Sequence, residues 1–119
     1  MDQSFQKELR LTHKKEIDKL FSSGKRIKSH PFIIIYNEVS QKTEVPFKLL
    51  ISVPKRNFKK AVDRNFLKRR VREVVRKNKE LLSSKSDKTL HIAILYSFNI
   101  KLEYNKIETN LLEALKKIQ

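Results

Sequence analysis

The amino-acid sequence predicts an α+β fold in which three helices pack on a small mixed β-sheet. Two kinds of segment predict it: short runs rich in β-branched and aromatic residues, and longer segments whose apolar residues recur at helical spacing. They follow one another in the order α-β-β-α-β-α. The chain has one glycine and no proline- or serine-rich linker, so its 119 residues are expected to form a single domain.

The N-terminal part of the chain is expected to contain one helix. Residues 1–10 carry too few apolar positions to predict an ordered structure. From Thr12, a residue type that favours N-caps, apolar residues recur at helical spacing towards Gly24. This glycine is expected to end the helix in the left-handed conformation. The basic connector Lys25–His30 follows and has room for one extra short edge strand.

Two strands are expected in the middle of the chain. Phe32–Tyr36 and Phe47–Val53 are rich in β-branched, aromatic and aliphatic residues, a composition typical of strands. The segment Ser40–Pro46 between them is expected to be a hairpin loop, with the second strand returning beside the first. Pro54 lacks a backbone N–H and is expected to end that second strand.

The second half of the chain is expected to contain two helices and one strand. A basic helix is predicted from about Lys60 to Lys79, a solvated loop at Ser83–Lys88, and a buried strand at Leu90–Tyr96. A final amphipathic helix is indicated by five apolar residues at helical spacing, namely Ile107, Leu111, Ala114, Leu115 and Ile118.

The segment Lys55–Lys79 is the strongest indication of function. Twelve of its residues are Lys or Arg and only Asp63 and Glu73 are acidic, which makes it about +10 of the formal +15 of the chain. At about 100° per residue, one side of the helix collects Leu67, Val71, Val74 and Val75, and another side collects Ala61, Arg64, Asn65, Lys68, Arg69, Arg72 and Arg76. A core-facing stripe with a separate cationic stripe predicts binding to a polyanion.

Composition narrows the class of partner and the compartment. A net charge of +15 favours nucleic acid over anionic lipid, and a merely solvated charge run is the alternative. The sequence has no cysteine, which excludes disulfides and thiolate metal sites. It also has no apolar run of membrane-spanning length and no signal-peptide core at its start, so a cytoplasmic location is expected.

No catalytic or metal-binding pattern is present in the sequence. The histidines His13, His30 and His91 have no partner at metal-ligand spacing, and His91 lies in an apolar strand where packing is expected. Asp63 and Glu73 are isolated among cations, where ion pairing along the helix is their expected role. The protein alone is therefore predicted to be inactive as a nuclease and to hold no cofactor.

The cationic side of the basic helix has the chemistry of a phosphate-binding surface. Arg64, Lys68, Arg72 and Arg76 recur every four residues and form one row, suited to a backbone rather than to a single base. Asn65 beside the row is expected either to bond a base edge or 2′-hydroxyl, or to cap local backbone. Base stacking on a sheet surface and core packing are alternative roles for the aromatic residues Phe21, Phe32, Tyr36, Phe47, Tyr96 and Phe98.

The segment Ala61–Glu73, AVDRNFLKRRVRE, resembles the AVxRNxxKRxxRE signature of the bacterial ribonuclease P protein subunit. The resemblance extends over most of the chain. The helix exit at Phe21-x-x-Gly24, the strand end Ile51–Arg56 and the C-terminal strand and helix all fall in the family's order.

The resemblance implies a fold and an activity. The fold would be an α/β sandwich of the ribosomal-protein S5 domain 2-like type. The enzyme would be a ribonucleoprotein whose RNA subunit uses Mg²⁺ to hydrolyse the 5′ leader from precursor tRNA. The protein would bind that catalytic RNA and the leader, with no membrane and no obligate protein partner.

The resemblance also implies two sets of site residues. The RNA-binding set is Lys55, Arg56, Lys60, Arg64, Asn65, Lys68, Arg69, Arg72 and Arg76. The leader cleft, between the first helix and the sheet, would be lined by Ile17, Phe21, Ile33, Ile35, Tyr36 and Ser52.

This chain departs from the family pattern at three places. Ile17 stands where many members have a second phenylalanine, and Ile35 stands where a tyrosine is common. Either Ile35 or Tyr36 faces the cleft, because a one-residue slip exchanges the faces of a strand. The usual glycine before the signature is replaced by Asn57–Lys60, with one residue more. The cleft is therefore expected to be more aliphatic.

Three other functions remain open on the sequence alone. A ribosomal or structural RNA-binding protein would share the basic helix without a role in tRNA processing. A DNA-binding helix protein is disfavoured because no second helix lies one tight turn away. An independent nuclease is disfavoured by the lack of clustered carboxylates.

Overall fold

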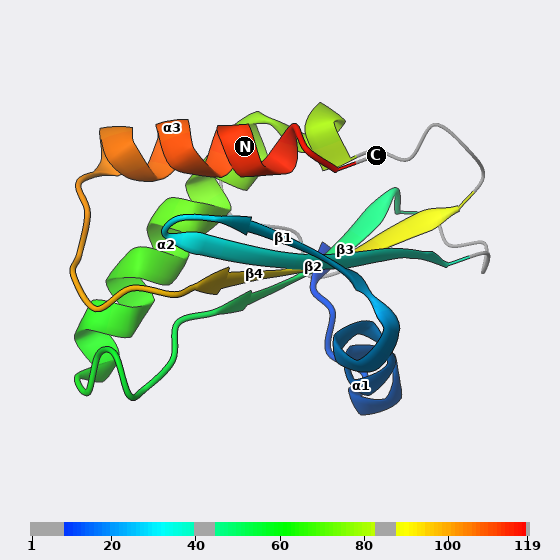
Figure 1. Ribbon diagram of the computed structural model, residues 1–119, viewed down its shortest axis with the longest axis horizontal. Helices are drawn as coiled ribbons and strands as arrows, with labels where there is room; N and C mark the ends of the chain where they lie inside the picture. Colours follow the sequence, from blue (N-terminus) through cyan, green and yellow to red (C-terminus); the bar gives the residue numbers. More distant parts are fainter. Residues whose placement is uncertain (1–8, 40–44, 83–87, 119) are drawn as a thin grey trace, which may run out of the picture.

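The structure, a computed structural model, describes residues 9–39, 45–82 and 88–118 (Figure 1). Within these residues the elements follow the predicted order, with the extra edge strand present as β1. Their bounds are α1 Lys14–Ser23, β1 Lys25–Ser29, β2 Phe32–Val39, β3 Phe47–Ser52, α2 Ala61–Lys77, the 3₁₀ turn η2 Lys79–Leu82, β4 Thr89–Tyr96 and α3 Tyr104–Leu115. The predicted α+β class, three helices on a small mixed sheet, is confirmed.

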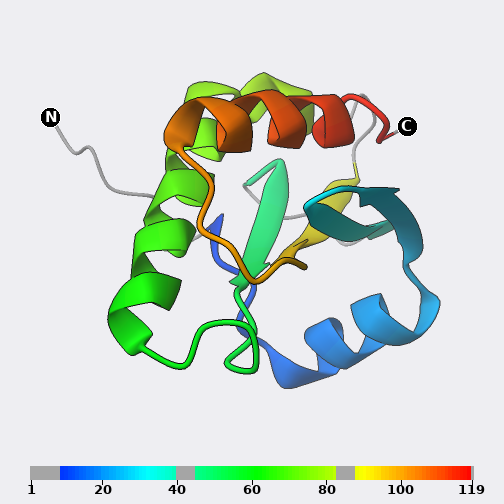
Figure 2. The same cartoon turned by 60° about the vertical axis from the view of Figure 1, so that its left-hand side comes forward.

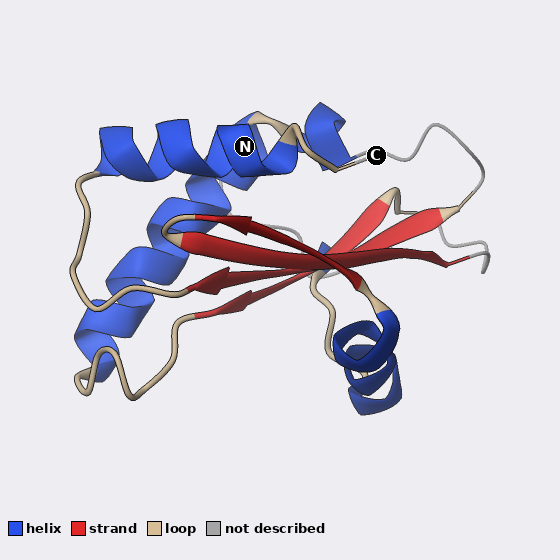
Figure 3. Ribbon diagram, in the orientation of Figure 1, coloured by secondary structure: helices blue, strands red, loops and turns tan. Residues whose placement is uncertain are grey.

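The four strands form one mixed sheet in the order β1-β2-β4-β3 (Figure 3). β2 pairs antiparallel with both β1 and β4, whereas β3 and β4 are parallel. The prediction of a β2–β3 hairpin is therefore wrong, because β4 lies between these strands; most of the predicted loop, residues 40–44, lies outside the described residues. The central place of β4 agrees with its burial on both faces, since seven of its eight residues are buried.

Helices cover the sheet on both faces. In Figures 1 and 2, α2 and α3 lie on one face and α1 lies on the other. Side chains of β2 alternate accordingly: Phe32, Ile34 and Tyr36 belong to the larger core under α2 and α3. Ile33 and Ile35 belong to a smaller cluster with α1. The alternation gives the sheet two separate apolar layers.

The exit from α1 depends on Gly24, but for a different reason from the one predicted. Its φ of −72° and ψ of 155° are extended, so the left-handed conformation is absent here. A Cβ on this residue would lie 2.5 Å from the Leu20 carbonyl oxygen and 2.8 Å from Cγ2 of Ile35. The glycine is therefore required by the close approach of the helix exit to β2. The N-cap of α1 is His13, one residue after the predicted Thr12.

Leu9 and Arg10, for which the sequence predicted no ordered structure, pack and pair with the sheet, while residues 1–8 lie outside the described residues. The Leu11 N–H donates to the Leu49 carbonyl at 2.9 Å, and Arg10 forms a parallel bridge with Leu49. Leu9 packs into the larger core and Leu11 into the cluster under α1. This short extended segment therefore covers the outer edge of β3. Among the described residues, no helix has the length and apolar composition needed to cross a bilayer.

Candidate nucleic-acid interface

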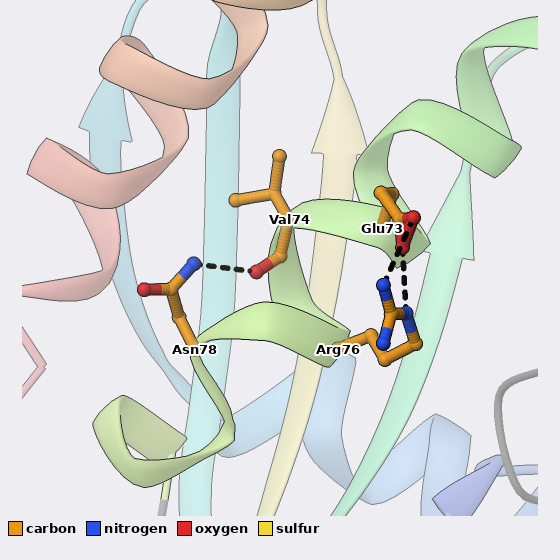
Figure 4. Close-up of polar contacts among 4 residues, drawn as sticks. All are labelled: Glu73, Val74, Arg76 and Asn78. Atoms are coloured by element: carbon orange, nitrogen blue, oxygen red, sulfur yellow. Dashed lines mark hydrogen bonds and ion pairs between the residues drawn. The ribbon is translucent and has the colours of Figure 1, made fainter. Parts of the chain in front are cut away.

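Helix α2 places the basic stretch along one side of the molecule (Figure 2). Its core face consists of the four predicted residues, Leu67, Val71, Val74 and Val75, all buried. The C-cap of the helix is Asn78, whose Nδ2 donates to the Val74 carbonyl at 2.8 Å (Figure 4). The packed face fixes the rotation of α2, and the predicted cationic row, Arg64, Lys68, Arg72 and Arg76, lies outside it.

Arg64 anchors the loop that leads into α2. Its Nη1 donates to the carbonyls of Phe58 at 2.8 Å and Lys59 at 2.9 Å. These bonds satisfy carbonyls next to Lys60, the N-cap residue, which makes no side-chain cap of its own. The guanidinium is thereby held in one orientation. Its Nε and Nη2 donate no hydrogen bond within the part of the chain that the structure describes, so they can bind an oxyanion.

Arg72 and Arg10 share a pocket at the junction of α2, β3 and the N-terminal segment. The pocket has a volume of about 150 Å³ and is lined by Arg10, Leu11, Thr12, Leu49, Leu50, Ile51 and Arg72. None of these residues is acidic. Burial lowers the pKa of Arg72, and the charges of Arg10 and Arg69 lower it further. An anion in this pocket would relieve that crowding of cations.

The C-terminal end of the cationic row is neutralised by an ion pair. Arg76 Nε donates to Glu73 Oε1 at 2.6 Å and Arg76 Nη2 to Oε2 at 3.2 Å (Figure 4). The bond lowers the pKa of Glu73 and raises that of Arg76. The ion pairing predicted for Glu73 is confirmed, but Asp63 pairs with Lys101 of the loop after β4, at 3.0 Å, instead of along its own helix.

The other predicted RNA-binding residues lie at or near the N-terminal half of α2. Lys55 and Arg56 are exposed in the turn after β3, and Lys60 is exposed at the start of the helix. Asn65 and Arg69 are exposed on α2, and Lys68 is half-buried. The positive charge without a carboxylate partner is therefore densest from Lys55 to Arg72.

The structure assigns the predicted cleft residues to two different layers. Ile17, Phe21 and Ile33 are half-buried around the cluster under α1, and Ile35 lies within it with no exposed surface. Placing Tyr36 in the cleft was wrong: its side chain packs into the larger core on the opposite face and is 7% exposed.

The remaining cleft residue, Ser52, is half-buried in β3 opposite Leu95 of β4. Leu50 and Leu95 also pack against the cluster under α1, and the sequence pattern did not indicate them as cleft residues. This face is therefore mainly aliphatic, and Phe21 is its one aromatic member among the described residues.

His91 is packed within β4, 3% exposed, with Asn37 of β2 and Lys48 of β3 as its register neighbours. Burial lowers its pKa; the charge of Glu16 opposes that shift and the charges of Lys48 and Lys19 add to it. Across the part of the chain that the structure describes, no three His, Cys, Asp or Glu side chains come together as a metal site.

Arg10 was not predicted from the sequence, because the segment that carries it has few apolar residues. The backbone pairing of this segment with β3 is what brings Arg10 to the pocket. Phe66, one turn from Val62 on α2, was not predicted either. Both residues are exposed beside cations. A count of the positive charges flanking each aromatic residue would have singled out Phe66.

Comparisons with known proteins agree on one family. The family model for Ribonuclease P matches residues 5–119. The ribonuclease P protein component of Porphyromonas gingivalis is 39% identical over 74 residues, which are 62% of this chain and 54% of that protein. The component from Streptococcus agalactiae is 33% identical over 110 residues, covering 92% of this chain and 94% of that protein.

The fold gives the same result. The ribonuclease P protein from Thermotoga maritima superposes with a TM-score of 0.76 at 25% identity, covering 92% of this chain and 97% of that one. Several curated relatives are longer than the matched region, and the chain spans about half the length of the Porphyromonas protein.

Proposed function

The chain belongs to the ribonuclease P family, and on this premise we propose that it is the protein subunit of ribonuclease P. It binds the catalytic RNA and the 5′ leader of precursor tRNA and supports endonucleolytic removal of that leader. The observation that carries the proposal is the half-buried cationic row on α2, whose Arg64, Lys68 and Arg72 reach the surface and have no carboxylate ion-pair partner among the described residues.

The protein's contribution is electrostatic and positional. Cations spaced one helical turn apart follow a phosphate backbone, and each phosphate contact releases counterions from the RNA. Arg64 is already oriented by its two carbonyl contacts, so it loses less side-chain entropy on binding. Hydrolysis is assigned to the RNA subunit and its Mg²⁺, in a cytoplasmic ribonucleoprotein.

The leader is proposed to lie along the sheet face beside α1. Phe21 and Ile33 offer half-buried apolar surface there, and Ser52 offers a hydroxyl at the end of β3. With Phe21 as its aromatic group in this layer, the surface would hold the leader through apolar contact more than through repeated base stacking.

The direct test is 5′-leader removal from a precursor tRNA by the cognate RNA subunit at low Mg²⁺, with and without the protein. Strong stimulation, with no cleavage by the protein alone, is expected. Tight RNA binding without stimulation would favour a structural RNA-binding protein instead. Cleavage by the protein alone, lost on mutation of a carboxylate, would contradict the assignment of catalysis to RNA.

A single substitution tests the phosphate contacts. Arg69→Ala removes an exposed cation that makes no ion pair among the described residues, so the fold should be unaffected. Affinity for the RNA subunit should fall, and the slope of log K against log salt should flatten by about one counterion. Lys106→Ala on α3 is the matched control and should leave the slope unchanged. An unchanged slope for Arg69→Ala would exclude a phosphate contact at this residue.

A further inference from the structure

A second exposed surface lies on the flank of α2 away from the cationic row. Among the described residues, three large hydrophobic side chains are exposed: Val62 at 69%, Ile100 at 56% and Phe66 at 37%. Val62 and Phe66 are one turn apart on α2. Lys101, next to Ile100, forms the 3.0 Å ion pair with Asp63, so the loop after β4 lies against this part of the helix. Apolar side chains grouped at the surface indicate an interaction site.

Cations are interleaved with aromatic rings on this surface. The guanidinium carbon of Arg70 lies 4.5 Å from the centroid of the Phe66 ring, and Lys101 Nζ lies 5.4 Å from it. The ring of Tyr104, at the start of α3, has Arg70 at 6.0 Å and Lys77 at 5.4 Å. Neither Arg70 nor Lys77 has an ion-pair partner among the described residues. We call Val62, Phe66, Arg70, Ile100, Lys101 and Tyr104 the Phe66 patch.

The Phe66 patch and the cationic row face different directions. At about 100° per residue, Phe66 is rotated by roughly 160° from Lys68 and by roughly 120° from Arg72 around the helix axis. A phosphate backbone that contacts Lys68 and Arg72 therefore leaves Phe66 uncovered. Arg69, rotated by roughly 60° from Phe66, lies between the two surfaces, and a further segment of the nucleic acid is needed to cover the Phe66 ring.

We propose that the Phe66 patch binds an unpaired segment of RNA, with a base stacking on the Phe66–Arg70 pair and the adjoining phosphates contacting Arg70 and Lys77. Stacked aromatic and guanidinium groups flanked by cations are the chemistry that binds single-stranded nucleic acid. A second copy of the chain fits this surface less well. Each copy carries a net charge of +15, and the positive charges of Arg70 and Lys77 would repel the positive charges of the other copy. The inference rests on the proposed RNA binding and adds a second contact surface to it.

The chain contains no tryptophan, so Phe66→Trp supplies a single fluorescent reporter within the patch. The probe is an unpaired uridine oligonucleotide, compared with an RNA duplex of equal length. The single strand should quench the Trp emission with saturation, because a base stacks on the indole, and the duplex should not. Glu113→Trp, at the other end of α3, is the control reporter and should not be quenched.

Binding affinities complete the test. Phe66→Ala should weaken single-strand affinity about tenfold with an unchanged salt slope, since stacking releases no counterion. Phe66→Tyr should keep the affinity for the single strand. Lys68→Ala should leave that affinity unchanged and instead flatten the salt slope measured with the RNA subunit. Because Phe66 is partly exposed, thermal melting should show the Phe66→Ala fold intact.

Three outcomes would overturn the inference. If single-stranded RNA does not quench Phe66→Trp while Lys68→Ala still flattens the salt slope for the RNA subunit, the Phe66 patch does not bind RNA and the proposed function stands. If none of the proteins binds RNA, both the Phe66 patch as an RNA site and the proposed function are contradicted. A dimer of the RNA-free chain in sedimentation, converted to monomer by Phe66→Ala, would assign the patch to a second copy.

Discussion

At the scale of single residues, orientation decides what a side chain does, and the local sequence specifies orientation unevenly. The run Phe32–Tyr36 is apolar throughout, so it has no polar alternation to show which residues share a face. Whether Ile35 or Tyr36 meets α1 was therefore settled only by packing. The four apolar positions of α2 were predictable because charged residues separate them at helical spacing.

The first prediction concerns Gly24, whose importance was predictable but whose geometry was not. Gly24→Ala places a Cβ 2.5 Å from a carbonyl oxygen of the helix backbone, which cannot rotate away. The free energy of unfolding should fall by about 1–3 kcal/mol, the usual cost of overpacking. Urea denaturation followed by circular dichroism measures it. Ser23→Ala, on the neighbouring exposed residue, should change stability by no more than about 0.5 kcal/mol. Equal stability of Gly24→Ala and the parent would contradict the close approach.

At the scale of elements, the three α-helices and the strands β2, β3 and β4 were predictable, β1 was expected only as an optional edge strand, and the pairing of the strands was not predictable. β3 follows β2 along the chain, which favoured a hairpin, but β4 pairs with both. Pairing of this kind depends on which strand buries both of its faces, a property of the assembled sheet. The segment around Leu9 and Leu11 was missed for the same reason, since its two leucines insert into different apolar layers.

The second prediction concerns the pocket that this segment forms with β3 and α2. Arg10 and Arg72 repel each other there, so inorganic pyrophosphate should bind and stabilise the fold by about 2.7 kcal/mol at a hundred times its Kd. Arg10→Ala should lose most of that gain while remaining as stable as the parent without anion, because one repulsion is removed. Thermal melting with and without pyrophosphate measures both effects. Lys106→Ala is the control, because it removes one positive charge outside the pocket. If it reduced the stabilisation by pyrophosphate as much as Arg10→Ala does, the stabilisation would come from general charge screening and not from binding in the pocket.

At the scale of the whole molecule, helices on both faces leave the middle of the sheet with little access to water. α1 covers one face, α2 and α3 the other, and β4 runs through the centre (Figures 1 and 2). A polyanion partner could be predicted without knowledge of this arrangement, because the net charge depends only on composition. The burial of a titratable side chain in the central strand depends on the arrangement, and it links the stability of the domain to pH.

The third prediction is that protonation of His91 makes the stability of the domain depend on pH. The pKa of His91 is lowered in the folded protein by burial first, then by Lys48 and Lys19, while Glu16 opposes the shift. Between the folded pKa and the unfolded value of about 6.5, the unfolded chain binds more protons. Stability should therefore be greatest above that value and decline as pH falls below it. Urea denaturation at pH 7.5 and 5.5 tests this in a range above the titration of Glu73, whose pKa is itself lowered. His91→Leu should reduce the decline and His13→Asn, at an exposed position, should not. A decline that His91→Leu leaves intact would assign the pH dependence to other groups.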